Sequence, residues 1–357
     1  MSKSVFRFIA AAAVAASLAA CGGSTSSSPG GSGSTTSPQT ACAHLAHALC
    51  ALRDSCAPSF GITKSYGTLS ACETRTALTC VSALSANGQA STPDRAEACA
   101  AAYPGESCTD LQDNNPTAAC APPAGSLQTG AACGASGQCA TTFCAVSKNA
   151  ICGTCQPLPM VGASCEAQAD CGRNLACAIP ATATAGTCAA WVASGGSCLT
   201  GHMPCEAGLA CVGDNPQSST AGTCKPQGTT VGAACDASRK TAANCDGSRG
   251  LVCIPTAKGS GVGTCQKMQL VGDGAACGDI GSAPITAHAE CQNGGMCVRA
   301  SAGDKTGTCV TPAAEGAPCN PDVTQGSPCL APARCVVPSG ALGTAGISTL
   351  PDASTCT

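Results

Sequence analysis

The sequence predicts a small disulfide-rich fold, in which an α-helical Cys-rich N-terminal domain is followed by an array of six short disulfide-stapled β-hairpin modules. Three observations predict it. The 357 residues include 34 cysteines, and most of these recur in one repeated pattern. Only 46 residues, about 13% of the chain, are Leu, Ile, Val or Phe, below the roughly 20% needed to bury enough apolar surface. A large enzyme core of the Rossmann or barrel type is therefore not expected.

Residues 1–20 have the layout of a secretory signal peptide. Lys3 and Arg7 precede an apolar run of small residues that is too short to span a bilayer permanently. The run ends in Leu18-Ala19-Ala20-Cys21, which resembles the lipobox of bacterial lipoproteins. The resemblance implies cleavage before Cys21 and acylation of its thiol, so the membrane is the expected partner through the lipid on Cys21. Acyl chains anchor stably because each buried CH₂ contributes about 0.8 kcal/mol.

Residues 21–40 comprise this cysteine and a linker dominated by Gly, Ser, Thr and Pro, which predicts a flexible tether. No second apolar stretch approaches membrane-spanning length, so we expect an exported lipoprotein at the outer membrane or cell surface. Loss of the signal peptide leaves 15 basic against 20 acidic residues. A net charge of about −5 argues against a nucleic-acid partner.

Residues 121–357 repeat one pattern six times. Each repeat contains Gly-x-x-Cys, then a second and a third Cys, and finally a closing Cys that usually follows Gly-Thr. Units this small cannot fold on hydrophobic burial alone, so two disulfides are expected to hold each of them. The opening cysteines are Cys133, Cys165, Cys198, Cys235, Cys277 and Cys319, and the closing ones are Cys155, Cys188, Cys224, Cys265, Cys309 and Cys356.

Four cysteines allow three pairings, and the sequence alone does not choose among them. We favour pairing the first with the third and the second with the fourth. The Gly three residues before each opener, such as Gly162, is expected to adopt a positive φ in a turn. Leu175, Leu209 and Leu251 each lie two residues before a third Cys and are expected to form small cores. The spacing resembles Dickkopf-type N-terminal cysteine-rich modules, which implies a stapled β-hairpin architecture but no particular ligand.

Residues 41–120 differ in character, because their apolar positions follow a helical period. Cys42, Leu45 and Leu49 fall on one helical face, and Leu69 begins a second periodic stretch. Thr92-Pro93 predicts an N-cap followed by proline at the first helical position. With eight cysteines, this segment predicts a small helical domain pinned by up to four disulfides. The lipobox, helical head and repeat tail together resemble uncharacterised surface lipoproteins of GC-rich bacteria, a resemblance that transfers no activity.

Apart from Cys21, eight cysteines in the helical domain and four in each repeat leave Cys152 over. Cys152-Gly153-Thr154-Cys155 matches the Cys-x-x-Cys motif of thiol oxidoreductases, but no βαβ pattern surrounds it. We interpret Cys152 as a structural cysteine or a possible unpaired thiol.

His44 and His47 lie between Cys42 and Cys50 on a predicted helix. This spacing suggests a Cys₂His₂ zinc site as one interpretation. An oxidising compartment converts such thiols to disulfides, so we interpret the histidines as solvent-facing and expect no metal and no cofactor.

No other residue forms a recognisable catalytic set, so the chain is not expected to be an enzyme. His202 and His288 are predicted to sit in loops without neighbours suited to general-base chemistry. Trp191, between two repeats, is interpreted as a small core contact in preference to a surface anchor. The Cys-x-x-Cys-His, Gly-x-Ser-x-Gly, P-loop and His-Glu-x-x-His motifs do not occur in the sequence.

The sequence thus favours a lipid-anchored cell-envelope protein whose stapled modules act as a structural stalk or as a binding or adhesion surface. Variable loops on a common rigid frame suit recognition of an extracellular protein or glycan. The alternative is a secreted or surface protease inhibitor, or a toxin-like effector, built on the same modules. An enzyme housed in residues 41–120 is disfavoured, because that segment has no identifiable nucleophile, base or metal set.

Overall fold

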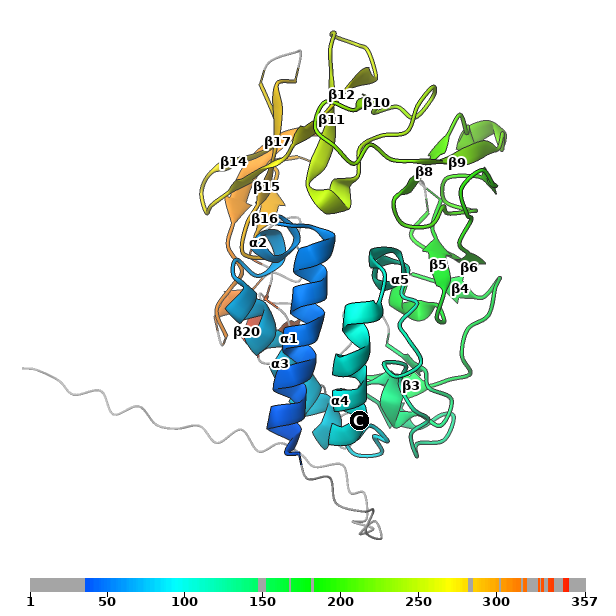
Figure 1. The fold of residues 1–357 in the computed structure, drawn as a ribbon, viewed down its shortest axis with the longest axis vertical. Helices are drawn as coiled ribbons and strands as arrows, with labels where there is room; N and C mark the ends of the chain where they lie inside the picture. The colour runs from blue at the N-terminus through cyan, green and yellow to red at the C-terminus, as the bar shows by residue number, and fades with distance from the viewer. Residues whose placement is uncertain are drawn as a thin grey trace, which may run out of the picture.

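The fold was determined as a computed structural model (Figure 1). Cys21, the predicted signal peptide and Cys356 lie outside the residues that it describes. The described residues are 36–146, 152–166, 168–180, 183–281, 285–301, 303–315, 317–319, 327, 329–330, 333–336 and 343–346.

A helical head forms the N-terminal part. Its first helix begins at Pro38, three residues before the predicted start of the domain, because the Ser37 side chain caps it by accepting the Thr40 N–H. The predicted cap at Thr92 is confirmed, since its side chain accepts the Arg95 N–H at the start of the fourth helix. The helices are α1 (Pro38–Cys56), α2 (Gly61–Ser65), α3 (Leu69–Ser85), α4 (Pro93–Ala102) and α5 (Cys108–Gln112), with a 3-10 turn at Tyr103–Gly105.

Four disulfides hold the head together, as the sequence predicted. Helix α1 packs against α3 and α4, and its buried face consists of Ala and Cys with a single Leu, Leu52. Leu45 and Leu49 are only half-buried and Leu69 is exposed, so covalent links take the place of a larger apolar core. The disulfides are Cys42–Cys80, Cys50–Cys72, Cys56–Cys108 and Cys99–Cys120.

Six small antiparallel β modules follow the head. In each, the strand with the closing Gly-Thr segment lies between the opening strand and the strand of the third Cys, so the predicted hairpin gains a third strand. The strands of modules 1–3 are β1 (Ala132–Cys133), β2 (Cys144–Ala145), β3 (Gly153–Cys155), β4 (Ser164–Cys165), β5 (Leu175–Ala178), β6 (Gly186–Ala190), β7 (Ser197–Cys198), β8 (Leu209–Val212) and β9 (Gly222–Pro226).

The fifth module differs from the others, because its sheet has five strands in the order β13-β15-β14-β17-β16. The strand β13 pairs with β15 in parallel, and all the other pairings of this sheet are antiparallel. The strands of modules 4–6 are β10 (Ala234–Asp236), β11 (Leu251–Pro255), β12 (Val262–Lys267), β13 (Gln269–Val271), β14 (Ala276–Ile280), β15 (Ala287–Cys291), β16 (Met296–Val298), β17 (Thr306–Val310), β18 (Pro318–Cys319), β19 (Arg334–Val336) and β20 (Gly343–Gly346).

The favoured disulfide pairing is confirmed in modules 1–5. The first cysteine pairs with the third and the second with the closing one, so the two bonds cross within each sheet. The pairs are Cys133–Cys144, Cys139–Cys155, Cys165–Cys177, Cys171–Cys188, Cys198–Cys211, Cys205–Cys224, Cys235–Cys253, Cys245–Cys265, Cys277–Cys297 and Cys291–Cys309.

Two positions of the repeat require glycine, each for a different physical reason. The Gly before the opener of each of modules 1–5 has a positive φ, for example +89° at Gly162, where an added Cβ would meet open space, so backbone conformation alone selects it. The Gly of Gly-Thr-Cys lies against the neighbouring strand: a Cβ on Gly263 would come within 2.0 Å of the Ile254 carbonyl oxygen. The repeated glycines therefore specify one turn and one close strand contact.

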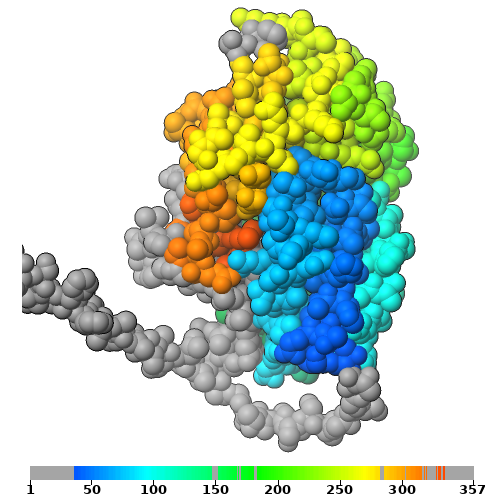
Figure 2. Space-filling model, turned by 60° about the vertical axis from the view of Figure 1, so that its left-hand side comes forward, coloured from blue at the N-terminus to red at the C-terminus, as the bar shows by residue number. Residues whose placement is uncertain are grey.

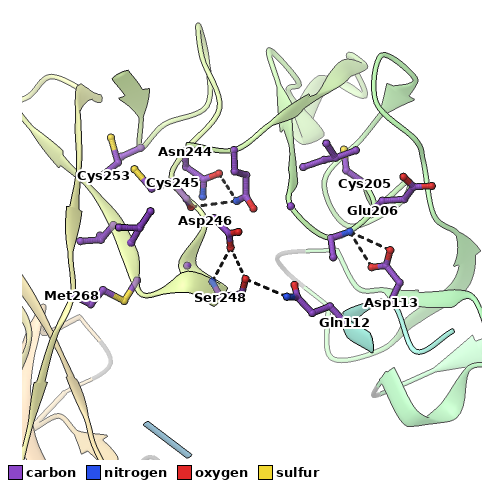
Figure 3. A pocket seen from close by; sticks show the side chains of 18 of the residues that line it. Gln112, Asp113, Cys205, Glu206, Asn244, Cys245, Asp246, Ser248, Cys253 and Met268 are labelled. Carbon is purple, nitrogen blue, oxygen red and sulfur yellow. Dashed lines mark hydrogen bonds between the residues drawn. The ribbon is translucent and has the colours of Figure 1, made fainter. Parts of the chain in front are cut away.

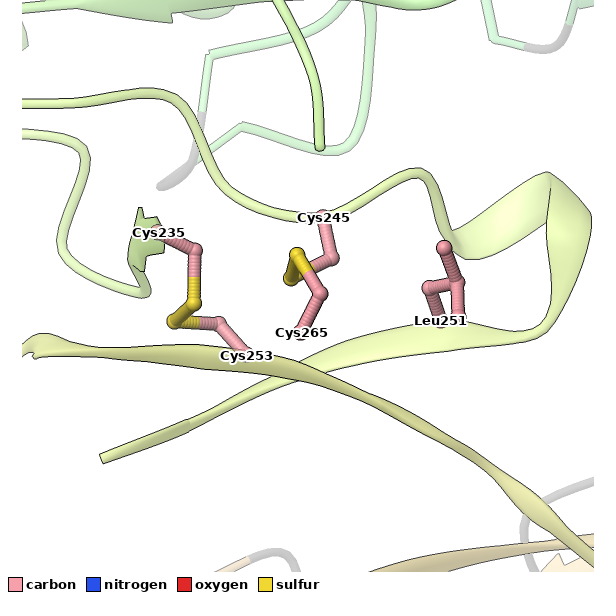
Figure 4. Close-up of a cluster of buried hydrophobic side chains, with 5 residues drawn as sticks. All are labelled: Cys235, Cys245, Leu251, Cys253 and Cys265. Atoms are coloured by element: carbon pink, nitrogen blue, oxygen red, sulfur yellow. A yellow bond between two sulfur atoms is a disulfide. The ribbon is translucent and has the colours of Figure 1, made fainter. Parts of the chain in front are cut away.

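Sulfur makes up most of the buried cluster in each of modules 1–5. In module 4 the two disulfides and Leu251 form one buried cluster (Figure 4). Leu175 and Leu209 pack, partly buried, against the corresponding clusters of modules 2 and 3. The predicted small Leu cores are thus confirmed as supplements to the disulfides.

The sixth module departs from the predicted pattern at its closing position. Its central strand carries Gly343-Thr344-Ala345, and Ala345 lies opposite Cys335. The prediction that Cys356 occupies this position is therefore wrong, because strand pairing places Ala345 there. Within the described part of the chain the free cysteine is Cys329, the second of this module, and Cys152 is disulfide-bonded. Of the two interpretations of Cys152, the structural cysteine is therefore confirmed and the unpaired thiol is wrong.

The modules curve around the helical head, and successive modules contact successive parts of it (Figure 1). Figure 2 shows the yellow and orange modules packed directly against the blue helices. The polar contacts, from module 1 to module 6, are Gln138 Nε2 to the Asn87 carbonyl (2.7 Å), Arg173 to the Pro116 carbonyl, the Ala207 N–H to Asp113 Oδ1 (3.0 Å), Gln112 Nε2 to Ser248 Oγ (3.3 Å), Lys64 Nζ to Glu290 Oε2 (3.2 Å) and Arg75 to Glu315.

No helix in the part of the chain that the structure describes combines the length and apolarity needed to cross a membrane. The many disulfides indicate an extracellular or otherwise oxidising location.

Candidate functional site: a cleft between the head and modules 3 and 4

A cleft of about 530 Å³ lies where the end of α5 meets modules 3 and 4 (Figure 3). Most of its walls come from three parts of the chain that are distant in sequence: Gln112 and Asp113, then residues 205–209, then residues 244–248 and 251–253. Leu209, Leu251 and Met268 add apolar surface to a lining that also contains carboxylates and carboxamides. A concave surface of this mixed character is the usual form of a ligand site.

Asp113 carries the most perturbed carboxyl group of the cleft. Both of its oxygens accept the backbone N–H of Ala207, at 3.0 and 3.2 Å, and the residue is 4% exposed. Burial raises the pKa of Asp113 to about 6, the Ala207 N–H opposes that rise, and the negative charges of Glu206 and Asp110 add to it. A carboxyl group inside a cleft, in surroundings that disfavour its charged form, is a candidate functional group.

Trp191, which precedes the opener of module 3, contacts Asp113 at the same end of the cleft. Its indole Nε1 donates to the Asp113 carbonyl oxygen at 3.1 Å, and the residue is half-buried at the edge of the cleft. The tryptophan therefore makes a small, half-buried contact, as predicted in preference to a surface anchor, and its partner is the helical head.

The opposite wall belongs to module 4. Asp246 Oδ1 accepts from the backbone N–H and the hydroxyl of Ser248, at 3.0 and 2.5 Å, and Gln112 Nε2 reaches the same hydroxyl from α5. Beside them, Gln227 Nε2 donates to Asn244 Oδ1 at 2.9 Å. These bonds hold the polar groups in fixed positions along the wall (Figure 3).

Every charged side chain that lines the cleft is acidic. Asp113, Glu206 and Asp246 line it, and no Lys or Arg is among its lining residues, all of which lie in the described part of the chain. Arg249, whose Nε lies 3.4 Å from Asp246 Oδ2, offsets that one carboxylate from outside the cleft. The field inside therefore favours neutral or cationic ligands over anionic ones.

A second depression, of about 930 Å³, lies between modules 1 and 2. The linker residues Leu158, Met160 and Val161 border it and are all exposed, and Met160 is the most exposed at 77%. Its charged lining residues are Glu166 and Asp170, and both belong to module 2. The cleft beside Asp113, by contrast, brings together polar groups from the head and from two modules, so we place the candidate site there.

The four residues considered for a zinc site form other contacts. Cys42 and Cys50 form disulfides with different partners. His44 Nδ1 contacts Glu97 of α4 at 2.9 Å, whereas His47 Nδ1 contacts Glu73 of α3 at 2.7 Å, and both rings are largely exposed. The side chains diverge toward two helices and do not converge on one ion. The sulfur triplets that cluster within modules 1–5 belong to disulfides and are equally unsuited to metal binding.

The Cys-x-x-Cys segment does not form a redox pair, because Cys155 is bonded to Cys139 and closes module 1. His202 is exposed in a turn, as predicted. His288 contradicts the prediction: it lies on β15, and carboxylates contact both of its ring nitrogens.

Compared with protein-family models, curated proteins and solved structures, the chain matches none of them. The structure is thus that of a cysteine-rich protein with repeated small disulfide-bonded β modules. The sequence analysis missed Asp113 and Glu206. The local sequence around Asp113, Asp-Asn-Asn-Pro, indicates only a turn, and nothing in it reports a contact with a residue 94 positions away.

Proposed function

We propose that the chain is a lipid-anchored cell-envelope protein that binds a glycan in the cleft beside Asp113. The lipobox-like segment ending at Cys21 supports the anchor, and the dense disulfides agree with export. The tether of residues 21–40 would hold the folded part away from the lipid surface.

The curvature of the repeat array favours a binding function over a role as a structural stalk. A stalk needs modules that follow one another end to end, whereas each of these six modules touches the helical head. This arrangement brings α5, module 3 and module 4 together around one cleft, which a straight array would not form.

A sugar suits this cleft better than an anion does. Carboxylates and carboxamides, such as Glu206 and Asn244, match the hydroxyls of a saccharide, and the apolar side chains of Leu251 and Met268 suit its C–H faces. Because all the charged lining groups are acidic, the proposed ligands are neutral sugars or sugars that carry a protonated amine.

A glycan array probed with the chain after Cys21, tether included, tests this proposal. We expect neutral or amino-sugar glycans to be retained, and Glu206→Gln to weaken the best of them at least tenfold. Asp273→Asn, at an exposed carboxylate on module 5, is the matched control and should leave binding unchanged. An array without hits, or hits that Glu206→Gln leaves unaltered, would reject the cleft as a glycan site.

Small-angle X-ray scattering of the same protein tests the arrangement on which the proposal depends. A compact chain of this length has a radius of gyration of about 20 Å. A much larger value, with the profile of a rod, would favour the stalk.

A further inference from the structure

A network of four charged side chains joins the fifth module to the helical head. Asp279 of β14 and His288 of β15 face each other in the antiparallel register, and Glu290 lies two residues further along β15 on the same face. Lys64 comes from α2. We name these four side chains the latch cluster: Asp279, His288, Glu290 and Lys64.

Both nitrogens of the imidazole have an acidic partner. His288 Nδ1 lies 2.9 Å from Asp279 Oδ1, and Nε2 lies 3.2 Å from Glu290 Oε1. A neutral imidazole has one N–H and can donate to one carboxylate only, so the geometry is satisfied in full by the imidazolium. The two carboxylates lie at opposite ends of the ring and do not converge on one point, which excludes a shared metal ion.

The network crosses the boundary between module and head. Glu290 Oε2 lies 3.2 Å from Lys64 Nζ, which itself lies 5.5 Å from the centre of the Phe60 ring. Next to this ion pair, two backbone bonds dock the module on α2: the Asn293 N–H donates to the Thr63 carbonyl at 3.0 Å, and the Gly294 N–H to the Lys64 carbonyl at 2.7 Å. A Cβ on Gly294 would come within 3.0 Å of the Ser65 carbonyl oxygen, so this contact is close-packed.

We propose that the latch cluster is a proton-operated latch, which holds the fifth module on α2 while the His288 ring is protonated and loosens when the ring loses its proton. The neutral ring must give up one of its two carboxylate contacts. Glu290, which connects the ring to Lys64, then loses the cation that fixes its orientation. The docking bonds of residues 293 and 294 depend on that orientation.

His288 is the group of the cluster that titrates near neutral pH. The Glu290 and Asp279 carboxylates raise the pKa of His288 against the effect of burial, so its stabilising contribution is present below the ordinary value of about 6.5 and is lost as the pH rises through the raised pKa. His288 and Lys64 lower the pKa of Glu290 to about 2, so Glu290 stays ionised above pH 5. The neighbouring strands β13, β16 and β17 contribute no titratable side chain besides disulfide-bonded cysteines.

Hydrogen exchange of the Asn293 and Gly294 amides, corrected for intrinsic rates, measures the docking directly. From pH 5.5 to 8.5 we expect their protection to fall, by up to about tenfold for each unit by which docking raises the His288 pKa. His288→Gln should give low protection at both pH values, and Lys64→Met should lower it without exposing β14 or β15. His202→Gln, at an exposed histidine, is the matched control and should behave as the native chain.

Amides of β11 and β12 in module 4 report whether each variant remains folded. Constant protection at residues 293 and 294 across this pH range would overturn the latch. A pH dependence that persists in His288→Gln would overturn it equally, because another group would then be titrating.

Discussion

Ala345 lies opposite Cys335 in the strand register of the sixth module. At the equivalent position of modules 1–5, the closing cysteine lies opposite the third cysteine on the neighbouring strand. In those five modules the closing cysteine is bonded to the second one. Because Ala345 stands in its place, Cys329 has no such partner in the sheet and keeps a free thiol, whose pKa burial raises above its ordinary value. The sixth module therefore lacks one of the two staples of the repeat.

Ala345→Cys should restore that staple. The new cysteine would close a loop similar in length to the equivalent loops of modules 1–5, which span 16 to 20 residues, and would stabilise the module by about 3 kcal/mol. The measurement is a thiol titration of the denatured, unreduced protein together with thermal unfolding: we expect the Cys329 thiol to disappear and the melting temperature to rise. Ala345→Ser controls for polarity and should do neither. Two reactive thiols, one at each position, would show that the register differs from that described.

The sixth module also shows what cysteine spacing predicts and what it misses. Counting cysteines located the modules and their openers, and the favoured pairing holds in five of them. The same counting selected Cys356 as the last closer, although Ser354-Thr355 and not Gly-Thr precedes it. Strand pairing instead follows Gly-Thr: Gly343 lies opposite Cys319 just as Gly153 lies opposite Cys133. Attention to the Gly-Thr pair at 343–344 would have identified the missing closer.

The cleft could not be predicted from the sequence, because it depends on how the modules return to the head. The helical period and the Thr92 cap are local signals and were interpreted correctly. The bond between Asp113 and Ala207, by contrast, joins residues 94 positions apart, and that between Lys64 and Glu290 joins even more distant ones. Neither partner of these pairs lies in a local pattern that distinguishes it from other surface carboxylates or amides.

Asp113→Asn should change how stability depends on pH. The pKa of Asp113 is raised to about 6, so the native state binds this proton more tightly than the unfolded chain, and stability falls as the pH rises from about 4 through 6. Asn keeps an acceptor for the Ala207 N–H without a buried charge, so at pH 8 the variant should be as stable as the native chain or more so.

Thermal unfolding at pH 4, 6 and 8 measures this effect as the difference between variant and native chain. Asp273→Asn is the control, since that carboxylate also accepts a distant backbone N–H, from Thr311 at 2.8 Å, but is exposed. If the difference in stability between variant and native chain does not grow with pH, the raised pKa of the Asp113 carboxyl in the cleft is contradicted.

Gln138 should be the main polar attachment of module 1 to the head. The residue is fully buried; its Oε1 accepts the N–H groups of Gly134 and Ala135, and its Nε2 donates to the Asn87 carbonyl. Gln138→Leu leaves three backbone groups without this partner and is expected to cost about 3 kcal/mol, measured by urea unfolding with the disulfides intact. Gln138→Glu should cost less, because it keeps the two acceptor bonds.

Gln128→Leu is the control for that experiment, because the side chain is exposed and donates to the carbonyl of Ser126 two residues away. It should shift the urea midpoint little. Equal effects of the two Leu variants would mean that burial of Gln138 adds nothing to its hydrogen bonds.

Complete reduction should unfold both the head and the modules at 25 °C. The buried cluster of module 1 consists of four cysteines, with Leu127 and Val146 only packed against it, so little apolar surface remains to oppose chain entropy when the bonds break. Each bond of the modules closes a loop of 11 to 20 residues and contributes about 3 kcal/mol. Circular dichroism and protease resistance before and after reduction measure the loss, with protein alkylated without a reductant as the control. A reduced chain that kept its spectrum and its resistance would contradict this prediction, because contacts other than sulfur bridges would then have to hold the sheets.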